Sequence, residues 1–144
     1  MFKLDEDSRL AAWSKIRKTV DTSDNPFQEV IDFWVNAPFT TGKPRLDPYY
    51  QASWPTPWEI IVENLYDDFS KAVMMGYTIL LTEKFKESLV EIRTLVDNKN
   101  NRLYNIVVID NEWALNFNDF SPIKLAEIPD FCRLENLVVL ERPR

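Results

Sequence analysis

The sequence predicts an α+β fold in which N-terminal helices and a central apolar helix pack on a small antiparallel sheet. Three observations lead to this class. Apolar residues recur at helical spacing through the first half of the chain, one long apolar helix follows, and runs rich in branched residues fill the rest. Helices that precede consecutive strands are typical of α+β proteins rather than of alternating α/β proteins. Neither a repeat nor a low-complexity tract divides the chain, so we expect one domain over residues 1–144.

Two amphipathic helices are expected near the N-terminus. Asp7 or Ser8 can cap the first helix, whose apolar face continues at helical spacing to about Val20. A turn-forming stretch at 21–25 separates it from a second helix over Pro26 to Val35, which has proline at its first position.

The stretch from Asn36 to Ser53 is long and irregular, with three prolines and a glycine. A connection of this length without secondary structure is uncommon in a compact domain. We predict that it wraps the core and is anchored by aromatic rings; a functional loop is the alternative. The expected anchors are Phe39, Tyr49 and Tyr50.

The rest of the chain is organised around residues 54–81, which begin with a short helix. Thr56 is suited to cap a helix from Pro57 to about Glu63, because Glu59 three residues later completes a capping box. Proline at the first helical position supports the same start.

An acidic turn then begins a longer helix that ends near Leu81. Asp67 or Asp68 places a carboxylate at the positive end of the helix dipole. Apolar residues cover most of the circumference, so we expect this helix to be central rather than on the surface. Gly76 in its interior costs roughly 1 kcal/mol relative to alanine, which we interpret as room for a neighbouring backbone.

Strands are predicted after the helices. Segments over Glu87 to Val96 and Arg102 to Ile109 are separated by a polar loop, and Glu112 to Phe117 returns after an Asp-Asn turn. These segments predict a three-stranded antiparallel sheet against the long helix. A short helix from Ser121 to about Glu127 and an apolar strand from Leu134 to Leu140 are expected to follow.

The composition excludes several classes of function. The chain has no histidine and one cysteine, Cys132, so an internal disulfide is impossible, and zinc or iron sites of ordinary type are not expected. We predict neither a metal nor a cofactor. The net charge of −6 argues against a broad nucleic-acid surface, which needs a basic patch. Because the N-terminus is charged and no run of about 20 apolar residues exists, we predict no signal peptide, no membrane span and a cytoplasmic location.

Several residues that could carry chemistry have a simpler structural interpretation. Asp67 and Asp68 could form a metal or acid–base pair, but adjacent helical residues point about 100° apart, which favours a role at the helix dipole. Cys132 has no histidine to activate it and is interpreted as a buried thiol. The aromatic residues near the central helix could line a groove, although core packing explains them as well. A cation could be bound by the oxygen-rich set, but its spacing matches no EF-hand and turn chemistry explains most of its members: Asp110, Asn111, Asn116, Asn118 and Asp119.

The order of these features resembles the transglutaminase-like cysteine peptidase family, which has a papain-like core. Trp54, Thr56, Pro57 and Glu59 match that family's W-x-T-P-x-E element at the same spacing. An acidic-aromatic segment that starts the core helix and a later strand hairpin follow in the same order. The resemblance implies that the family's catalytic cysteine, its histidine and its final acidic or amide residue align with Tyr66, Tyr104 and Asn116.

These substitutions imply a catalytically dead version of the family. A cysteine nucleophile normally needs a neighbouring histidine, and phenols with an unperturbed pKa of about 10 cannot replace the pair near neutral pH. We therefore expect a pseudoenzyme that acts as a binding or interaction module for an unknown protein or small-molecule ligand. Its oligomeric state is open. The vestigial cleft is expected to contain Trp54, Tyr66, Asp67, Tyr104 and Asn116.

Two alternative functions and one broader setting also fit the sequence. A carboxylate-dependent hydrolase would use Asp67 or Asp68 together with Glu59. A structural component of a larger assembly would use exposed aromatic residues as its contact surface. The small size and acidic charge also fit a viral, phage-like accessory protein.

Overall fold

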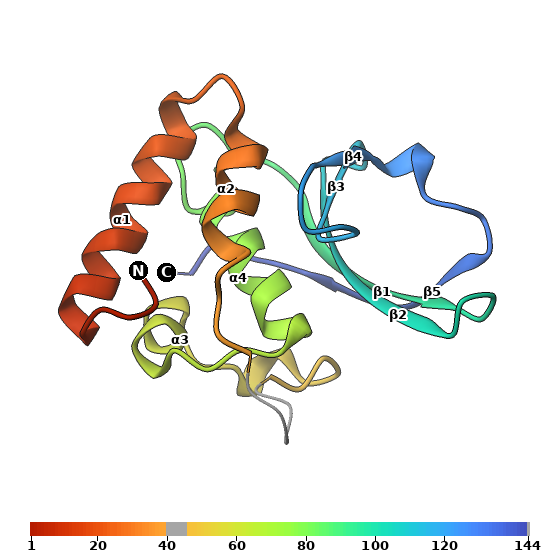
Figure 1. Cartoon of the computed structure of the whole chain (residues 1–144), viewed down its shortest axis with the longest axis horizontal. Coiled ribbons are helices and arrows are strands. Elements are labelled where there is room, and N and C mark those ends of the chain that lie inside the picture. The colour runs from red at the N-terminus through yellow and green to blue at the C-terminus, as the bar shows by residue number, and fades with distance from the viewer. Residues whose placement is uncertain (40–45, 144) are drawn as a thin grey trace.

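Residues 1–39 and 46–143 are the part of the chain that the computed structural model describes, and within them four α-helices and five strands form an α+β fold. Figure 1 shows the helices gathered on one side and the strands on the other. The long helix α4 (Asp68–Leu80) lies between the sheet and the pair of N-terminal helices. The predicted class and the central place of this helix are therefore confirmed.

The N-terminal helices are α1 (Glu6–Thr22) and α2 (Pro26–Trp34). The predicted cap of α1 is wrong by two or three residues: the carboxylate of Asp5 accepts a hydrogen bond of 2.9 Å from the backbone N–H of Ser8. An aspartate three residues before this N–H is a standard N-cap arrangement. Helix α2 begins at the predicted proline and ends one residue before the predicted end.

Helices α3 (Pro57–Glu63) and α4 confirm the interpretation of the central stretch. In α3, the Thr56 hydroxyl accepts from the backbone N–H of Glu59, and the Glu59 carboxylate accepts from that of Thr56, both at 3.2 Å. In α4, Asp67 is the N-cap, and every residue from Phe69 to Leu80 is buried. The apolar residues over most of the circumference of α4 thus correctly indicated that the helix is buried on all sides.

Gly76 makes room for side chains, not for the neighbouring backbone that its position predicts. A Cβ atom built at Gly76 would lie 2.5 Å from Cδ1 of Leu140, 3.3 Å from Cγ1 of Val90 and 3.4 Å from Cδ1 of Ile92. The glycine therefore lets α4 settle directly on the apolar face of the sheet.

One hydroxyl joins α1 and α2 to α4. The Thr78 oxygen accepts hydrogen bonds from Nε1 of Trp13 at 2.9 Å and Nε1 of Trp34 at 3.0 Å, and it donates to the carbonyl of Met74 at 2.6 Å. Both indoles are fully buried. This contact satisfies two buried N–H groups with one side chain and fixes the layer of N-terminal helices.

The sheet has five antiparallel strands in the order β4-β3-β2-β1-β5, where a three-stranded sheet was predicted. Strand β2 (Arg102–Ile109) has the predicted bounds, and β1 (Val90–Asp97) begins three residues later than predicted. The last predicted strand is β5 (Cys132–Val139), which pairs with β1 and so adds to the same sheet.

The region after β2 differs most from the prediction. Strand β3 (Trp113–Leu115) is short because Asn116 adopts a left-handed conformation with φ 69°. The predicted helix from Ser121 to Glu127 is wrong: this segment forms β4 (Ile123–Lys124) and a 3₁₀ turn over Leu125–Glu127. Pairing of β4 with β3 replaces the helix that proline at the start of the segment suggested.

The predicted aromatic anchors of the long connection are also wrong for the described residues. Phe39, Tyr49 and Tyr50 are 60%, 75% and 60% exposed. The buried residues are instead the small or aliphatic Ala37 and Leu46, and a 3₁₀ turn over Gln51–Ser53 lies between this segment and α3. Residues 40–45 of the predicted wrap lie outside the described residues.

Apolar side chains pack on both faces of the sheet. The helix-side core contains α4 together with Val90, Ile92, Val107, Ile109 and Leu115. A smaller group, which we call the far-face cluster, contains Leu95, Ile106, Val108 and Ala114. Alternation along each strand separates the two groups, because neighbouring residues point to opposite faces.

Candidate functional site

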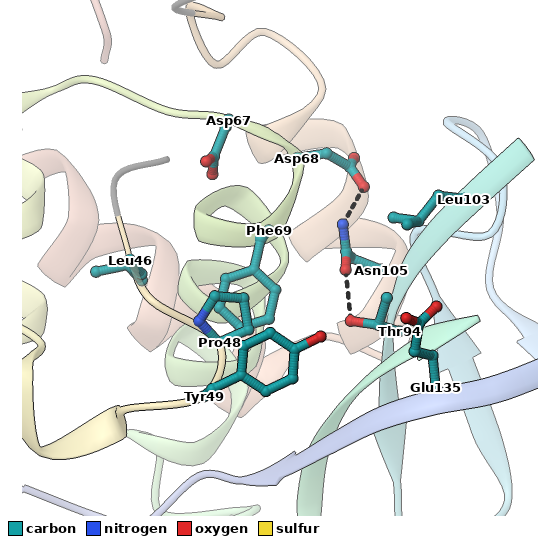
Figure 2. A pocket seen from close by; sticks show the side chains of 10 residues that line it. All are labelled: Leu46, Pro48, Tyr49, Asp67, Asp68, Phe69, Thr94, Leu103, Asn105 and Glu135. Carbon is teal, nitrogen blue, oxygen red and sulfur yellow. Dashed lines mark hydrogen bonds between the residues drawn. The ribbon is translucent and has the colours of Figure 1, made fainter. Parts of the chain in front are cut away.

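A pocket of about 350 Å³ lies where the N-terminal end of α4 meets the sheet. Its ten lining residues come from the segment 46–49, from the start of α4 and from strands β1, β2 and β5, as Figure 2 shows. Segments far apart in the sequence therefore converge here.

The start of α4 separates the roles of its two aspartates. The Asp67 carboxylate accepts from the backbone N–H of Ser70 at 2.8 Å, and the Ser70 hydroxyl accepts from the backbone N–H of Asp67 at 2.9 Å. This reciprocal pair is a capping box. Asp68, the first helical residue, is rotated away from Asp67 and extends to the sheet (Figure 2).

A network of side-chain amides orients the Asp68 carboxylate. Its Oδ2 accepts from Nδ2 of Asn105 at 3.0 Å, and its Oδ1 accepts from Nδ2 of Asn116 at 3.3 Å. Asn116 also donates to the carbonyl of Asn105 at 2.8 Å, and the Thr94 hydroxyl donates to Oδ1 of Asn105 at 2.8 Å. The network holds one carboxylate in a defined position at the junction of helix and sheet.

The remaining walls combine apolar surface with a second carboxylate. Phe69 is buried and Pro48 is half-buried, whereas Tyr49 and Leu103 are 75% and 55% exposed. Glu135 of β5 is exposed and lines the same pocket. Within the described part of the chain, no lysine or arginine lines it. The pocket thus presents carboxylates beside apolar walls.

Tyr66 lies in the helix-side core and is fully buried. Its ring packs edge-to-face against Trp34 and Phe2, with centroid distances of 5.3 and 5.9 Å. Its hydroxyl has no hydrogen-bond partner among the described residues. Burial, reinforced by the charge of Glu63 and opposed by that of Arg9, raises the pKa of this phenol above its ordinary value.

Tyr104 lies on the other face of the sheet. Its ring packs against the far-face cluster and stacks on Phe117 with a centroid distance of 4.5 Å. The Arg102 guanidinium lies 4.8 Å from its centroid. Tyr66 and Tyr104, which the family resemblance aligns with a catalytic pair, therefore pack in different clusters and do not share a cleft.

The other residues predicted for the cleft divide between two places. Asn116 joins Asp68 in the amide network, and Asp67 lines the pocket beside it. Trp54 packs edge-to-face on Phe69 at 5.7 Å and donates from Nε1 to the carbonyl of Asp47 at 2.7 Å, but it does not line the pocket. The structure brings together Asp67 and Asn116 of the predicted set.

Sequence reasoning missed Asp68 as the centre of the site, together with Thr94, Asn105 and Glu135. A signal for two of these residues was present. Thr94 and Asn105 are polar residues on strand faces that are otherwise apolar, and they lie opposite one another in the β1–β2 register. A polar cross-strand pair facing a buried helix needs hydrogen-bond partners, which here come from the start of α4.

Other candidates have structural roles. Glu59 caps α3, outside the pocket that Asp67 and Asp68 line. Asp110 and Asn111 adopt left-handed turn conformations, and the Asp110 carboxylate accepts from the backbone N–H of Leu89 at 2.8 Å. Cys132 is half-buried rather than buried as predicted, and desolvation together with the charge of Asp97 raises the pKa of its thiol.

Comparison with known proteins gives no assignment. The chain matches no protein-family model and no curated protein sequence. Among residues 1–39 and 46–143, no three histidine, cysteine or acidic side chains form a group suited to hold a metal ion. In the same residues, no helix combines the length and the apolar character needed to cross a bilayer. A functional proposal has to come from the pocket itself.

Proposed function

We propose that the protein is a non-enzymatic interaction module whose pocket at the start of α4 receives a basic side chain of a partner protein. The observation that carries this proposal is the fixed Asp68 carboxylate, oriented by two amides and flanked by exposed apolar walls. Charged hydrogen bonds to an oriented carboxylate are stronger than neutral ones and favour arginine or lysine.

The shape and charge of the pocket suit the two parts of such a side chain. The aliphatic stem of arginine or lysine packs on apolar surface while its charged end stays with polar groups. Tyr49 offers a ring face for the stem or the guanidinium, and Leu103 offers an aliphatic wall. Glu135 supplies a second negative charge at the same pocket.

The hydrogen bonding favours binding over catalysis. Thr94, Asn105, Asp68 and Asn116 form a chain of mutual hydrogen bonds. A nucleophile is normally activated by an adjacent base, and neither histidine nor cysteine is available for this role in the pocket. A carboxylate-dependent hydrolase is the weaker alternative, because Glu59 caps another helix.

The transglutaminase-like core stays a prediction on which this proposal does not depend. The capping box at Thr56 and Glu59, and a core helix on an antiparallel sheet, support it. The packing of Tyr66 and Tyr104 in separate clusters gives it no support.

The test is an NMR titration of the ¹⁵N-labelled protein with N-acetyl-arginine amide. Saturable shifts are expected for the backbone amides of Asp68 and Thr94 and for the side-chain amides of Asn105 and Asn116. N-acetyl-norleucine amide, which has an apolar side chain without the charge, should give no saturable shifts. Arginine shifts that do not saturate, or that map outside the pocket, would contradict the proposal.

A matched pair of variants tests the role of charge. Glu135→Gln should weaken arginine binding by about threefold, since an exposed ion pair contributes about 0.7 kcal/mol. Glu87→Gln, which neutralises an exposed carboxylate outside the pocket, should leave the affinity unchanged. Equal effects of the two variants would indicate attraction by net charge alone.

A second candidate function is a component of a larger assembly. It is favoured by large exposed aromatic side chains, which interfaces use and isolated surfaces rarely need. Exposed fractions of 60% or more are found at Phe39, Tyr49, Tyr50 and Phe120.

A further inference from the structure

Strand β5 ends the sheet on one side. It pairs with β1 and, within the described residues, with no other strand (Figure 1). An edge strand presents unpaired backbone N–H and C=O groups that can pair with another chain. Natural proteins usually protect an edge strand from pairing with other chains. The side chains along β5 therefore indicate whether this edge is protected or binds a partner.

Hydrogen bonds at the end of β5 fix which of its backbone groups point outward. The N–H of Leu140 donates to the carbonyl of Val90 at 2.9 Å, so the backbone groups of Val90 point to β5. Backbone direction alternates along a strand, and every second residue of β1 after Val90 therefore also points to β5. Leu95 is not among them and directs its groups to β2. Because Leu134 lies opposite Leu95, its own N–H and C=O point to the free edge.

Side-chain hydrogen bonds limit access to the edge near the C-terminal end of β5. Nε2 of Gln51 donates to the carbonyl of Val139 at 3.1 Å, and Nδ2 of Asn136 donates to the carbonyl of Pro48 at 3.2 Å. The first contact occupies a backbone acceptor at the end of the strand. The accessible part of the edge therefore centres on the first half of β5.

This part of the edge carries exposed apolar side chains. Leu134 and Leu137 of β5 are 55% and 38% exposed, and Phe131, directly before the strand, is 39% exposed. Leu134 and Cys132 line a hollow over the far-face cluster, so they point away from α4. An exposed apolar edge strand is a known site of association between chains.

Two opposite charges flank Leu134. Glu135 lines the pocket on the α4 side of the sheet, and alternation places Arg133 on that side as well. Among the described residues, neither Arg133 nor Glu135 has an ion-pair partner. An arginine and a glutamate two residues apart on one face are self-complementary in an antiparallel pair.

We propose that two copies of this chain associate through β5, antiparallel about a two-fold axis at Leu134. In this register Leu134 meets its own copy and exchanges both of its outward hydrogen bonds. Arg133 then lies opposite Glu135 of the second copy, and the same pair forms again across the axis. On the face away from α4, the exposed Leu134 side chains of the two copies then contact each other.

The charges select this register over its neighbours. An axis at Arg133 would place the two arginines opposite each other, and an axis at Glu135 would do the same with the glutamates. Like charges directly opposite are destabilising. A β-bulge near Glu135 shortens the regular pairing, so the interface is at the small and weak end of specific interfaces. A concentration-dependent dimer is expected.

Charge reversal tests the register directly. Sedimentation velocity over a concentration series should show a monomer–dimer equilibrium for the wild type. Arg133→Glu and Glu135→Arg should each weaken the dimer by at least about tenfold, since each places like charges opposite each other twice. The double variant Arg133→Glu/Glu135→Arg should restore it. Phe120→Ser, which removes an exposed aromatic elsewhere, should leave the dimer unchanged.

Hydrogen exchange provides a second measurement that does not depend on any variant. The outward amide of Leu134 should exchange fast in the dilute monomer and slowly at dimer concentrations. The amide of Arg133 lies opposite Val96 and points to β1, so it should be protected at both. The proposal would be overturned if the wild type stayed monomeric. It would also be overturned if neither single charge reversal changed the dissociation constant of the dimer. A double variant that is folded by circular dichroism but does not regain the dimer would also contradict the proposal.

The dimer and the arginine pocket can be tested separately. Arg133 does not line the pocket, so the Arg133→Glu monomer should still give saturable arginine shifts at Asp68. Loss of the dimer with arginine binding intact separates the two proposals.

Discussion

At the scale of single residues, Tyr66 carries a hydroxyl that is buried without a hydrogen-bond partner among the described residues. Leaving such a group unsatisfied costs about 1 to 3 kcal/mol. Tyr66→Phe should therefore increase the free energy of unfolding at neutral pH by about 1 kcal/mol, measured by urea denaturation. Tyr49→Phe, at a ring that is 75% exposed, should have no effect and serves as the control.

The same residue predicts a dependence on alkaline pH. Burial raises the pKa of Tyr66 in the folded state, while the unfolded phenol ionises near pH 10. Above that pH the folded state holds a proton that the unfolded state loses, so stability falls as pH rises. The advantage of Tyr66→Phe over the wild type should grow by about 1.4 kcal/mol per pH unit between pH 10 and the raised pKa of the folded state. A constant difference between the two proteins would contradict this account.

The adjacent aspartates show what sequence reasoning can and cannot give for a site. The acidic start of a helix was predictable from cap chemistry, and Asp67 indeed caps α4. The partners of Asp68 come from β2 and from the turn after β3, and no local pattern states that these meet the helix start. Long-range contacts of this kind depend on the sheet register, which the sequence leaves open.

At the scale of elements, the contact between α4 and the sheet depends on Gly76. Gly76→Ala gains about 1 kcal/mol of helix propensity but forces Leu140 to move, and overpacking costs about 1 to 3 kcal/mol. We expect a net loss of about 1 kcal/mol. In a Leu140→Ala background the same change should instead stabilise by about 1 kcal/mol. A double-mutant cycle by urea denaturation measures this coupling, and additive effects would contradict it.

The elements predicted correctly were those with cap, turn or periodicity signals in their own sequence. Helices α3 and α4 carry capping boxes and an apolar pattern, and β2 lies between two turns and ends in four consecutive β-branched residues. The region 121–127 was mispredicted because proline at a first helical position is only a weak signal. Pairing with β3 then decided its structure.

At the scale of the whole molecule, the N-terminal helices are held to the remainder by the Thr78 hydroxyl. Thr78→Val keeps the shape of the side chain but leaves the indole N–H groups of Trp13 and Trp34 buried without their acceptor. We expect a loss of about 3 kcal/mol, measured by urea denaturation followed by circular dichroism. Thr78→Ser retains the oxygen and should lose about 1 kcal/mol. Similar losses for both variants would show that the methyl group, not the hydroxyl, matters.

This arrangement gives the molecule an optical property. Trp13 and Trp34 come from different helices, yet both indoles are shielded from water and share one acceptor on α4. Their fluorescence emission should therefore lie at short wavelength while all three helices are assembled, and should shift to the red as soon as either N-terminal helix separates. Against the emission of Trp54, Trp58 and Trp113, a red shift of these two indoles can thus report detachment of the helical layer before the strands lose their own circular dichroism signal.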